Sequence, residues 1–162
     1  MRHWTLLSLM FLVLARPAFG QTGTDVLVGW EAVDARVLLD WDDDIEGYDD
    51  ETLQVRAETA FQRELRSAGI PVSDSPMNFL WLTYNLMAGT GDQAGLVIYS
   101  IDLEFSERAA TEHSGTTVWA KTWVEPGSVG TVGQNNLLDT LESDSRSAAQ
   151  SFANAWLAAN PR

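Results

Sequence analysis

Residues 79–105, FLWLTYNLMAGTGDQAGLVIYSIDLEF, contain two apolar stretches separated by a glycine-rich loop. In the second stretch five apolar residues alternate with polar ones: Val97, Tyr99, Ile101, Leu103 and Phe105. This alternation is typical of a strand with one buried face. The first stretch, 79–88, is apolar at most positions, which predicts an inner strand with both faces partly covered. Residues 89–95 form the kind of loop that joins two strands into a hairpin.

Two more strands are expected outside this hairpin. Residues 33–41 alternate between apolar and polar positions and run into an acidic loop, 42–50. Residues 116–124 form the fourth strand, and their alternation places Trp119 and Trp123 on one face. The glycine-rich stretch 127–133 is interpreted as a turn between this strand and the last helix.

Two segments have apolar residues at helical spacing. The first covers about residues 50 to 68, with Asp49 or Asp50 as the N-cap and Gly69 just beyond its end. The second covers about residues 136 to 159 and is stopped by Pro161. Each helix carries one apolar stripe, so both can pack on the same face of a sheet. We therefore predict an α+β fold: a four-stranded, mainly antiparallel sheet with two helices on one face, in the order β-α-β-β-β-α.

The first twenty residues have the composition of a secretory signal peptide. Arg2 and His3 precede an uncharged apolar run, 4–15, and Ala18-Phe19-Gly20 provides a cleavage site. We expect residues 1–20 to be removed and residues 21–162 to form a single α+β domain, periplasmic or secreted. The apolar run is shorter than the roughly 20 residues of a membrane-spanning helix, and no later segment approaches that length, so no membrane span is expected.

The chain is strongly acidic and contains no cysteine. It has 10 Lys and Arg against 23 Asp and Glu, a net charge of −13, and loss of Arg2 and Arg16 with an acid-free leader would change this to −15. Nucleic acid and anionic membranes need a cationic face, so neither is expected as a partner. The charge is explained by solubility or adaptation to salt, or alternatively by attraction of cations or a basic partner. Without cysteine, neither disulfides nor a cysteine-linked lipid anchor are expected.

Two segments resemble known exported proteins. The ending SFANAWLAANP, 151–161, after Gly127-Ser128-Val129-Gly130, resembles the tail of uncharacterised small exported bacterial proteins. The helix ending at 65–70, LRSAGI, before a strand is similar, more loosely, to small periplasmic modules of outer-membrane assembly lipoproteins. The second resemblance is one of architecture, and the chain departs from it by lacking the cysteine that carries the lipid. Neither resemblance assigns an activity or a site residue.

The acidic loop is a candidate calcium site. Within residues 40–51, carboxylates occupy positions suited to a flexible oxygen-ligand loop: Asp40, Asp42, Asp44, Glu46 and Glu51. The pattern departs from a calcium-binding loop at Ile45, because a tight turn there needs glycine. The alternative is a solvated acidic turn that places negative charge at the start of the following helix.

Few residues are suited to catalysis. After residues 1–20 the only histidine is His113, and Ser114 is its neighbour in sequence rather than a residue brought to it by the fold. One histidine and no cysteine cannot form the usual zinc site. A small hydrolase using His113 or paired carboxylates is kept as an alternative function.

The strands carry more large apolar residues than two helices can cover. Trp81, Trp119 and Trp123 are the candidates for an exposed binding surface on the sheet face away from the helices, although strand aromatics also fill cores. The sequence thus favours an exported, soluble, non-catalytic binding or envelope-assembly module. Its expected partner is another protein or a second copy of the chain, and no cofactor is expected apart from calcium at the acidic loop.

Overall fold

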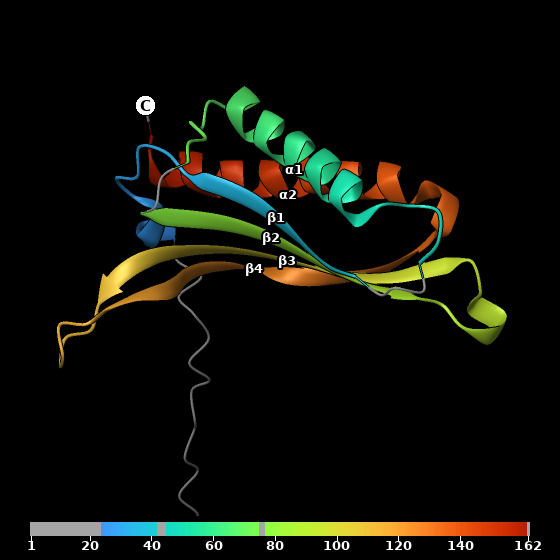
Figure 1. Cartoon of the computed structure of the whole chain (residues 1–162). Helices are drawn as coiled ribbons and strands as arrows, with labels where there is room; N and C mark the ends of the chain where they lie inside the picture. The colour runs from blue at the N-terminus through green and yellow to red at the C-terminus, as the bar shows by residue number, and fades with distance from the viewer. Residues whose placement is uncertain (1–23, 42–44, 75–76, 162) are drawn as a thin grey trace, which may run out of the picture.

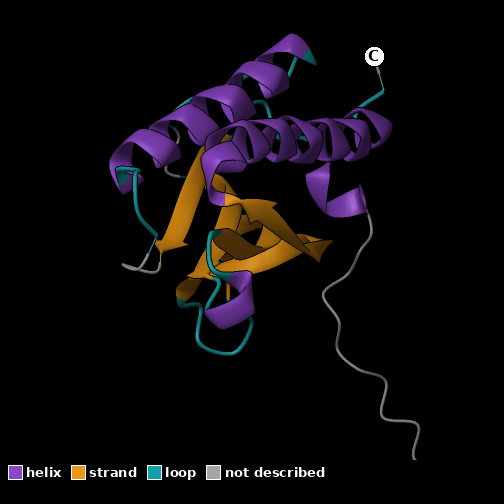
Figure 2. Ribbon diagram, turned by 90° about the vertical axis from the view of Figure 1, so that its right-hand side faces the viewer, coloured by secondary structure: helices purple, strands orange, loops and turns teal. Residues whose placement is uncertain are grey.

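The computed structural model describes residues 24–41, 45–74 and 77–161. The elements follow in the order η1 (Thr24–Leu27), β1 (Asp34–Trp41), α1 (Asp50–Ser67), β2 (Asn78–Ala88), η2 (Gly91–Gln93), β3 (Leu96–Ala110), β4 (Thr117–Gly133), η3 (Gln134–Asn136) and α2 (Leu137–Ala159). Both long helices lie side by side on one face of the sheet (Figures 1 and 2). The predicted α+β fold and its order β-α-β-β-β-α are confirmed. The proposed leader, residues 1–20, lies outside the described residues.

The sheet has the strand order β1-β2-β3-β4. β2 pairs antiparallel with β3, and β3 pairs antiparallel with β4, as the hairpins require. β1 instead pairs parallel with β2, with Val37 beside Leu82. A parallel pair needs a crossover connection, and α1 provides it. The sheet is therefore mixed, with two antiparallel pairs and one parallel pair.

The core lies between the sheet and the helices. Leu80, Leu82, Tyr84 and Leu86 of β2 point into it and are buried, whereas Phe79, Trp81, Thr83 and Asn85 on the other face are half-buried. Below α2, the ring of Phe152 contacts those of Phe105, Trp123 and Trp156 at centroid distances of 6.0, 5.4 and 5.7 Å. None of the described helices is long and apolar enough to cross a membrane.

The ends of α1 follow from its sequence. The Asp49 carboxylate accepts a hydrogen bond of 3.0 Å from the Thr52 N–H, as an N-cap does. After the last turn, Gly69 has a φ of 83° and the Ile70 N–H donates to the Leu65 carbonyl. Both the N-cap residue and the terminal glycine expected from the sequence are confirmed.

The glycine-rich stretch differs from its prediction, since it is not a turn but the second half of β4. Gly130 lies opposite Tyr99, and a Cβ atom there would be 2.6 Å from the Tyr99 ring. Gly127 is equally constrained, because a Cβ atom at that position would be 2.6 Å from the Asp102 carboxylate. These glycines let β4 pass close to bulky side chains of β3, which is a sheet role rather than a turn role.

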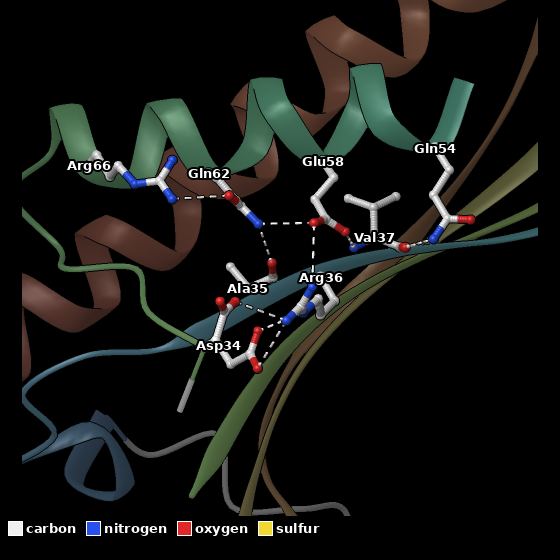
Figure 3. Close-up of polar contacts among 9 residues, drawn as sticks. Asp34, Ala35, Arg36, Val37, Gln54, Glu58, Gln62 and Arg66 are labelled. Atoms are coloured by element: carbon white, nitrogen blue, oxygen red, sulfur yellow. Dashed lines mark hydrogen bonds and ion pairs between the residues drawn. The ribbon is translucent and has the colours of Figure 1, made fainter. Parts of the chain in front are cut away.

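The two edges of the sheet differ in whether other groups of the protein bond to them. Along β1, the Glu58 carboxylate accepts from the Val37 N–H (3.1 Å), the Gln54 amide donates to the Val37 carbonyl (2.9 Å) and the Gln62 amide donates to the Ala35 carbonyl (2.9 Å) (Figure 3). Side chains of α1 therefore occupy three of the backbone groups, at Ala35 and Val37, that another strand would use. No strand within the described residues pairs with the far edge of β4.

Candidate functional site

An aromatic cluster occupies the sheet face that the helices leave uncovered. It consists of Phe79 and Trp81 from β2 and Trp119 from β4, and we call it the outer aromatic cluster. Phe79 stacks on Trp81 at 5.0 Å between ring centroids and meets the edge of Trp119 at 4.9 Å. Trp119 is 50% exposed. Two of the three tryptophans predicted to form a surface are therefore brought together there.

The prediction for Trp123 is wrong. Trp123 pairs with Phe105, whereas Lys121 pairs with Ser106, so Thr122 is an extra residue in β4. Such a bulge shifts the alternation by one position, which turns Trp119 and Trp123 to opposite faces. Trp123 is only 7% exposed and packs in the core against Phe152.

Charged side chains of both signs surround the outer aromatic cluster. The Arg36 guanidinium lies 2.7 Å from the Asp34 carboxylate, and Lys121 forms an ion pair with Glu104. Arg108 pairs in register with Trp119 and so lies on the same face. In a chain with more than twice as many acids as bases, this neighbourhood contains three bases, of which Arg36 also lies 3.1 Å from Asp74 and 3.9 Å from Glu58.

A pocket lies on the opposite side of the sheet, between α2 and the bulged part of β4, and we call it the α2–β4 pocket. Its volume is about 210 Å³. One wall is apolar, and the other carries carboxylates and hydroxyls: Ile101, Leu103, Pro126 and Ala148 against Glu125, Ser128, Asp144 and Ser147. The register explains the opening, because Pro126 and Gly127 together lie opposite the single residue Asp102.

Each of the two carboxylates in the α2–β4 pocket has one oxygen with a partner and one without. Glu125 Oε1 accepts from the Ser151 hydroxyl at 2.6 Å, while Glu125 Oε2 is buried and has no hydrogen-bond partner. The Tyr99 hydroxyl donates to Asp144, whose Oδ2 is buried and unpartnered. Burial raises the pKa of Asp144, and the hydrogen bond from Tyr99 opposes that rise.

Sequence reasoning missed this pocket because it depends on the glycine-rich half of β4. The space left by Gly130 lets the Tyr99 ring lie across the strand, where its hydroxyl reaches Asp144. The sequence does carry a signal for this pocket, namely the spacing of the glycines that follow a long strand with alternating residues. Glycine clusters mark turns more often than sheet positions, which is why the sequence alone favours a turn there.

The acidic loop is described only in part. Asp42 and Asp44 lie outside the described residues, while Asp40, Glu46 and Glu51 are exposed. Ile45, the residue at the position that calcium loops give to glycine, is buried in the core at 4% exposure. No group of three or more metal-ligating side chains occurs in the part of the chain that the structure describes. Calcium binding by Asp40, Asp42, Asp44, Glu46 and Glu51 stays a prediction.

His113 is exposed in the loop between β3 and β4. The hydroxyl of Ser114 forms hydrogen bonds with the Thr111 hydroxyl at 2.5 Å and the Thr116 hydroxyl at 2.9 Å, both within the same loop. These contacts organise the turn. They leave Ser114 oriented by threonines rather than by a base, so the loop lacks the geometry of a nucleophile pair.

Comparisons with known proteins give only distant likenesses. No protein-family model matches the chain, and no curated protein matches it in sequence. A PelC dodecamer from Paraburkholderia phytofirmans is 15% identical, with 78% of this chain and 90% of that chain covered and a TM-score of 0.36.

Two further solved structures are similar to the same degree. An uncharacterised protein is 15% identical over 80% of this chain and 83% of its own, with a TM-score of 0.37. The PelC dodecamer in a second crystal form is also 15% identical, over 75% and 87%, with a TM-score of 0.34. Likeness at this level carries no argument about function. None of these descriptions mentions outer-membrane assembly lipoproteins, so that resemblance stays a prediction.

Proposed function

We propose that the protein is an exported, non-catalytic binding or assembly module that contacts its partner through the outer face of the sheet. The observation that carries the proposal is the outer aromatic cluster, because both helices lie on the other face of the sheet (Figure 1) and Trp119 is half-exposed. Leu38, Met87 and Val124 extend the apolar surface along the same face. Exposed aromatic and aliphatic side chains on one face of a sheet are typical of an interface.

A second copy of the chain is the partner we propose. Two chains of net charge −13, or −15 after loss of residues 1–20, repel each other over most of their surfaces. Around the outer aromatic cluster, Arg36, Arg108 and Lys121 offset the local acids, so two copies meet least repulsion there. A two-fold pair would place the same patch on both sides of the interface, with tryptophan and arginine at its centre.

The test is the molar mass of the exported protein, measured by size-exclusion chromatography with light scattering over a range of concentrations. We expect a dimer for the natural sequence and a monomer for Trp119→Ser. The matched control is Val118→Ser, because Val118 is the exposed neighbour of Trp119 on the other face of β4. Intact mass of the same sample shows whether residues 1–20 have been removed.

A monomer at every concentration would overturn self-association. Co-purification of one stoichiometric protein that depends on Trp119 and not on Val118 would replace the second copy by that protein as the partner. A monomer that binds no protein in a Trp119-dependent manner would overturn the proposed use of the outer face.

A further inference from the structure

The first part of β4 has backbone groups that point away from the sheet. Just before this strand, the Thr111 N–H donates to the Thr116 carbonyl at 2.9 Å. Bonding alternates along an antiparallel pair, so the next residues that bond to β3 are Val118 and Ala120. The N–H and C=O groups that point outward therefore belong to Thr117, Trp119 and Lys121. No group within the described residues forms a hydrogen bond with them.

The usual protections of a strand edge are weak in this part of β4. Residues 116–124, TTVWAKTWV, contain one charged residue and no proline, and they are rich in residue types that favour strands. A lysine on an edge normally opposes pairing with another chain, but the ammonium group of Lys121 is already paired with Glu104 of β3. At the opposite edge, side chains of α1 bond to the backbone of β1. The start of β4 is therefore suited to accept another strand.

There is space for a strand beside this part of β4. Val118 lies on the helix side of the strand and is 41% exposed, so neither helix covers it. Figure 1 shows the hairpin of β3 and β4 extending beyond the ends of both helices. Trp119, on the opposite face, is half-exposed. An added strand would therefore meet neither helix, and its side chains would cover part of the Trp119 ring.

The charge of this segment fits a second copy of the same segment. The chain as a whole has a net charge of −13, so two copies approach most easily where acids are absent. Residues 116–124 contain no acid, and their single lysine is neutralised within its own sheet. A two-fold axis places the same residues on both sides of a contact, so neither copy brings an acid to it.

We propose that two copies of the chain pair antiparallel through the start of β4, about a two-fold axis beside Trp119. This geometry rests on the self-association proposed above and specifies how the two copies meet. Trp119 pairs with Trp119 of the second copy, and Thr117 pairs with Lys121 of the second copy. Each pair exchanges two backbone hydrogen bonds, which satisfies the outward groups of all three residues.

This register also joins the two outer aromatic clusters. The axis is perpendicular to the sheet, so both clusters lie on one face of the joined sheet, with the two Trp119 side chains next to each other at its centre. An axis at Lys121 would instead place two lysines opposite each other and would meet the bulge at Thr122. The position of the axis therefore follows from charge and from the regularity of the strand.

The first test removes an outward N–H group and leaves the outer aromatic cluster unchanged. Thr117→Pro removes the N–H that donates to Lys121 of the second copy, and proline is tolerated at the first residue of a strand. We expect the dissociation constant of the dimer to rise at least tenfold, as measured by sedimentation equilibrium on the full exported protein. The matched control is Thr117→Ala, which keeps the N–H group and should dimerise as the natural protein does.

The second test does not depend on how well the proline variant folds, and it uses the absence of cysteine from the chain. In the proposed pair, Val118 lies opposite Ala120 of the second copy, with a Cα–Cα distance of about 4.5 Å. A disulfide joins Cα atoms about 4.4–6.8 Å apart. Under oxidising conditions, a mixture of Val118→Cys and Ala120→Cys should therefore form a crosslinked dimer at least tenfold faster than either variant alone.

Two results would overturn pairing through β4. The first is a Thr117→Pro variant that dimerises as tightly as Thr117→Ala, and the second is a mixture of cysteine variants that crosslinks no faster than either variant alone. If Trp119→Ser is still monomeric in that case, the proposed use of the outer face stands and only the edge geometry is wrong. A natural protein that is monomeric at every concentration would overturn both the edge geometry and self-association.

Discussion

Asp144 is a residue whose charged form opposes folding. Its pKa in the folded protein lies above the ordinary value, because burial penalises the carboxylate more than the Tyr99 hydrogen bond favours it. Because the pKa is raised in the folded protein, the protonated Asp144 carboxyl contributes to stability. This contribution is fully present at pH values below the pKa of an aspartate in the unfolded chain. That contribution is lost as the pH rises through the folded pKa.

The raised pKa of Asp144 predicts how Asp144→Asn changes the melting temperature. At pH 7 the variant should melt at a temperature equal to or above that of the natural protein, since it removes a partly desolvated charge and keeps an acceptor for Tyr99. The two melting temperatures should converge toward pH 3. Scanning calorimetry from pH 3 to 8, with Asp139→Asn as an exposed control, measures the difference. A clear destabilisation by Asp144→Asn at pH 7 would show that the carboxylate stabilises the fold.

Phe152 is expected to be among the most sensitive positions in the core. It is fully buried and contacts three other aromatic rings, from Phe105, Trp123 and Trp156. Phe152→Ala should lower the free energy of unfolding by about 3–5 kcal/mol, because it removes this contact surface and leaves a cavity. Denaturant unfolding measures the loss, with the exposed Leu157→Ala on the same helix as the control. A loss below about 1 kcal/mol for Phe152→Ala would place α2 outside the cooperative core.

The residue pattern predicted burial well where the alternation was unbroken. In β3, the five positions expected to point inward, from Val97 to Phe105, are those that the structure buries or packs against the core. Trp123 was misplaced because the extra residue, Thr122, depends on pairing with β3 rather than on the local sequence. Alternation carries no signal of a bulge, which is set by the neighbouring strand.

At the scale of elements, α1 both covers the core and closes an edge. Gln54, Glu58 and Gln62 follow each other at intervals of one turn and reach the backbone of β1. Exposed strand edges invite pairing with other chains, and proteins block them in several ways. Here the block is formed by side chains of the adjacent helix.

Replacement of these three residues by alanine should have two effects. Loss of the hydrogen bonds should lower the free energy of unfolding by about 0.5–1.5 kcal/mol for each bond. The freed edge of β1 should also increase association at high concentration, as measured by light scattering. The control is Val55→Ala with Thr59→Ala, which changes exposed positions on the same helix. If both variants associate equally, the three side chains do not protect the edge of β1 from association.

The elements themselves were largely predictable, whereas the site was not. Helix caps and apolar stripes are local signals, and they located both helices with errors of about one residue. The parallel pairing of β1 with β2 and the extension of β4 to Gly133 depend on contacts far apart in the sequence. The α2–β4 pocket follows from that extension and from Gly130, so no local pattern could locate it.

For the whole molecule, the dominant physical property is its negative charge. Sodium chloride should raise the melting temperature by screening repulsion among the acids. If the acidic loop is only a solvated turn, calcium chloride should raise the melting temperature about as much as sodium chloride at matched ionic strength. We expect this outcome because Ile45 is buried in the core. A calcium-specific rise that disappears in Asp42→Asn with Asp44→Asn would instead establish the loop as a binding site.

The unequal edges of the sheet limit how far this protein can grow by adding strands. A fibre needs two strand edges that can pair on every subunit. Each added subunit then provides a new unpaired edge in place of the one that it covers. Here side chains of α1 cover the edge of β1 at Ala35 and Val37, whereas no other described strand pairs with the outer edge of β4. Two chains joined β4 to β4 would form one continuous eight-stranded sheet with both outer edges terminated. Growth through strand edges alone therefore stops at the pair, even though one edge stays open.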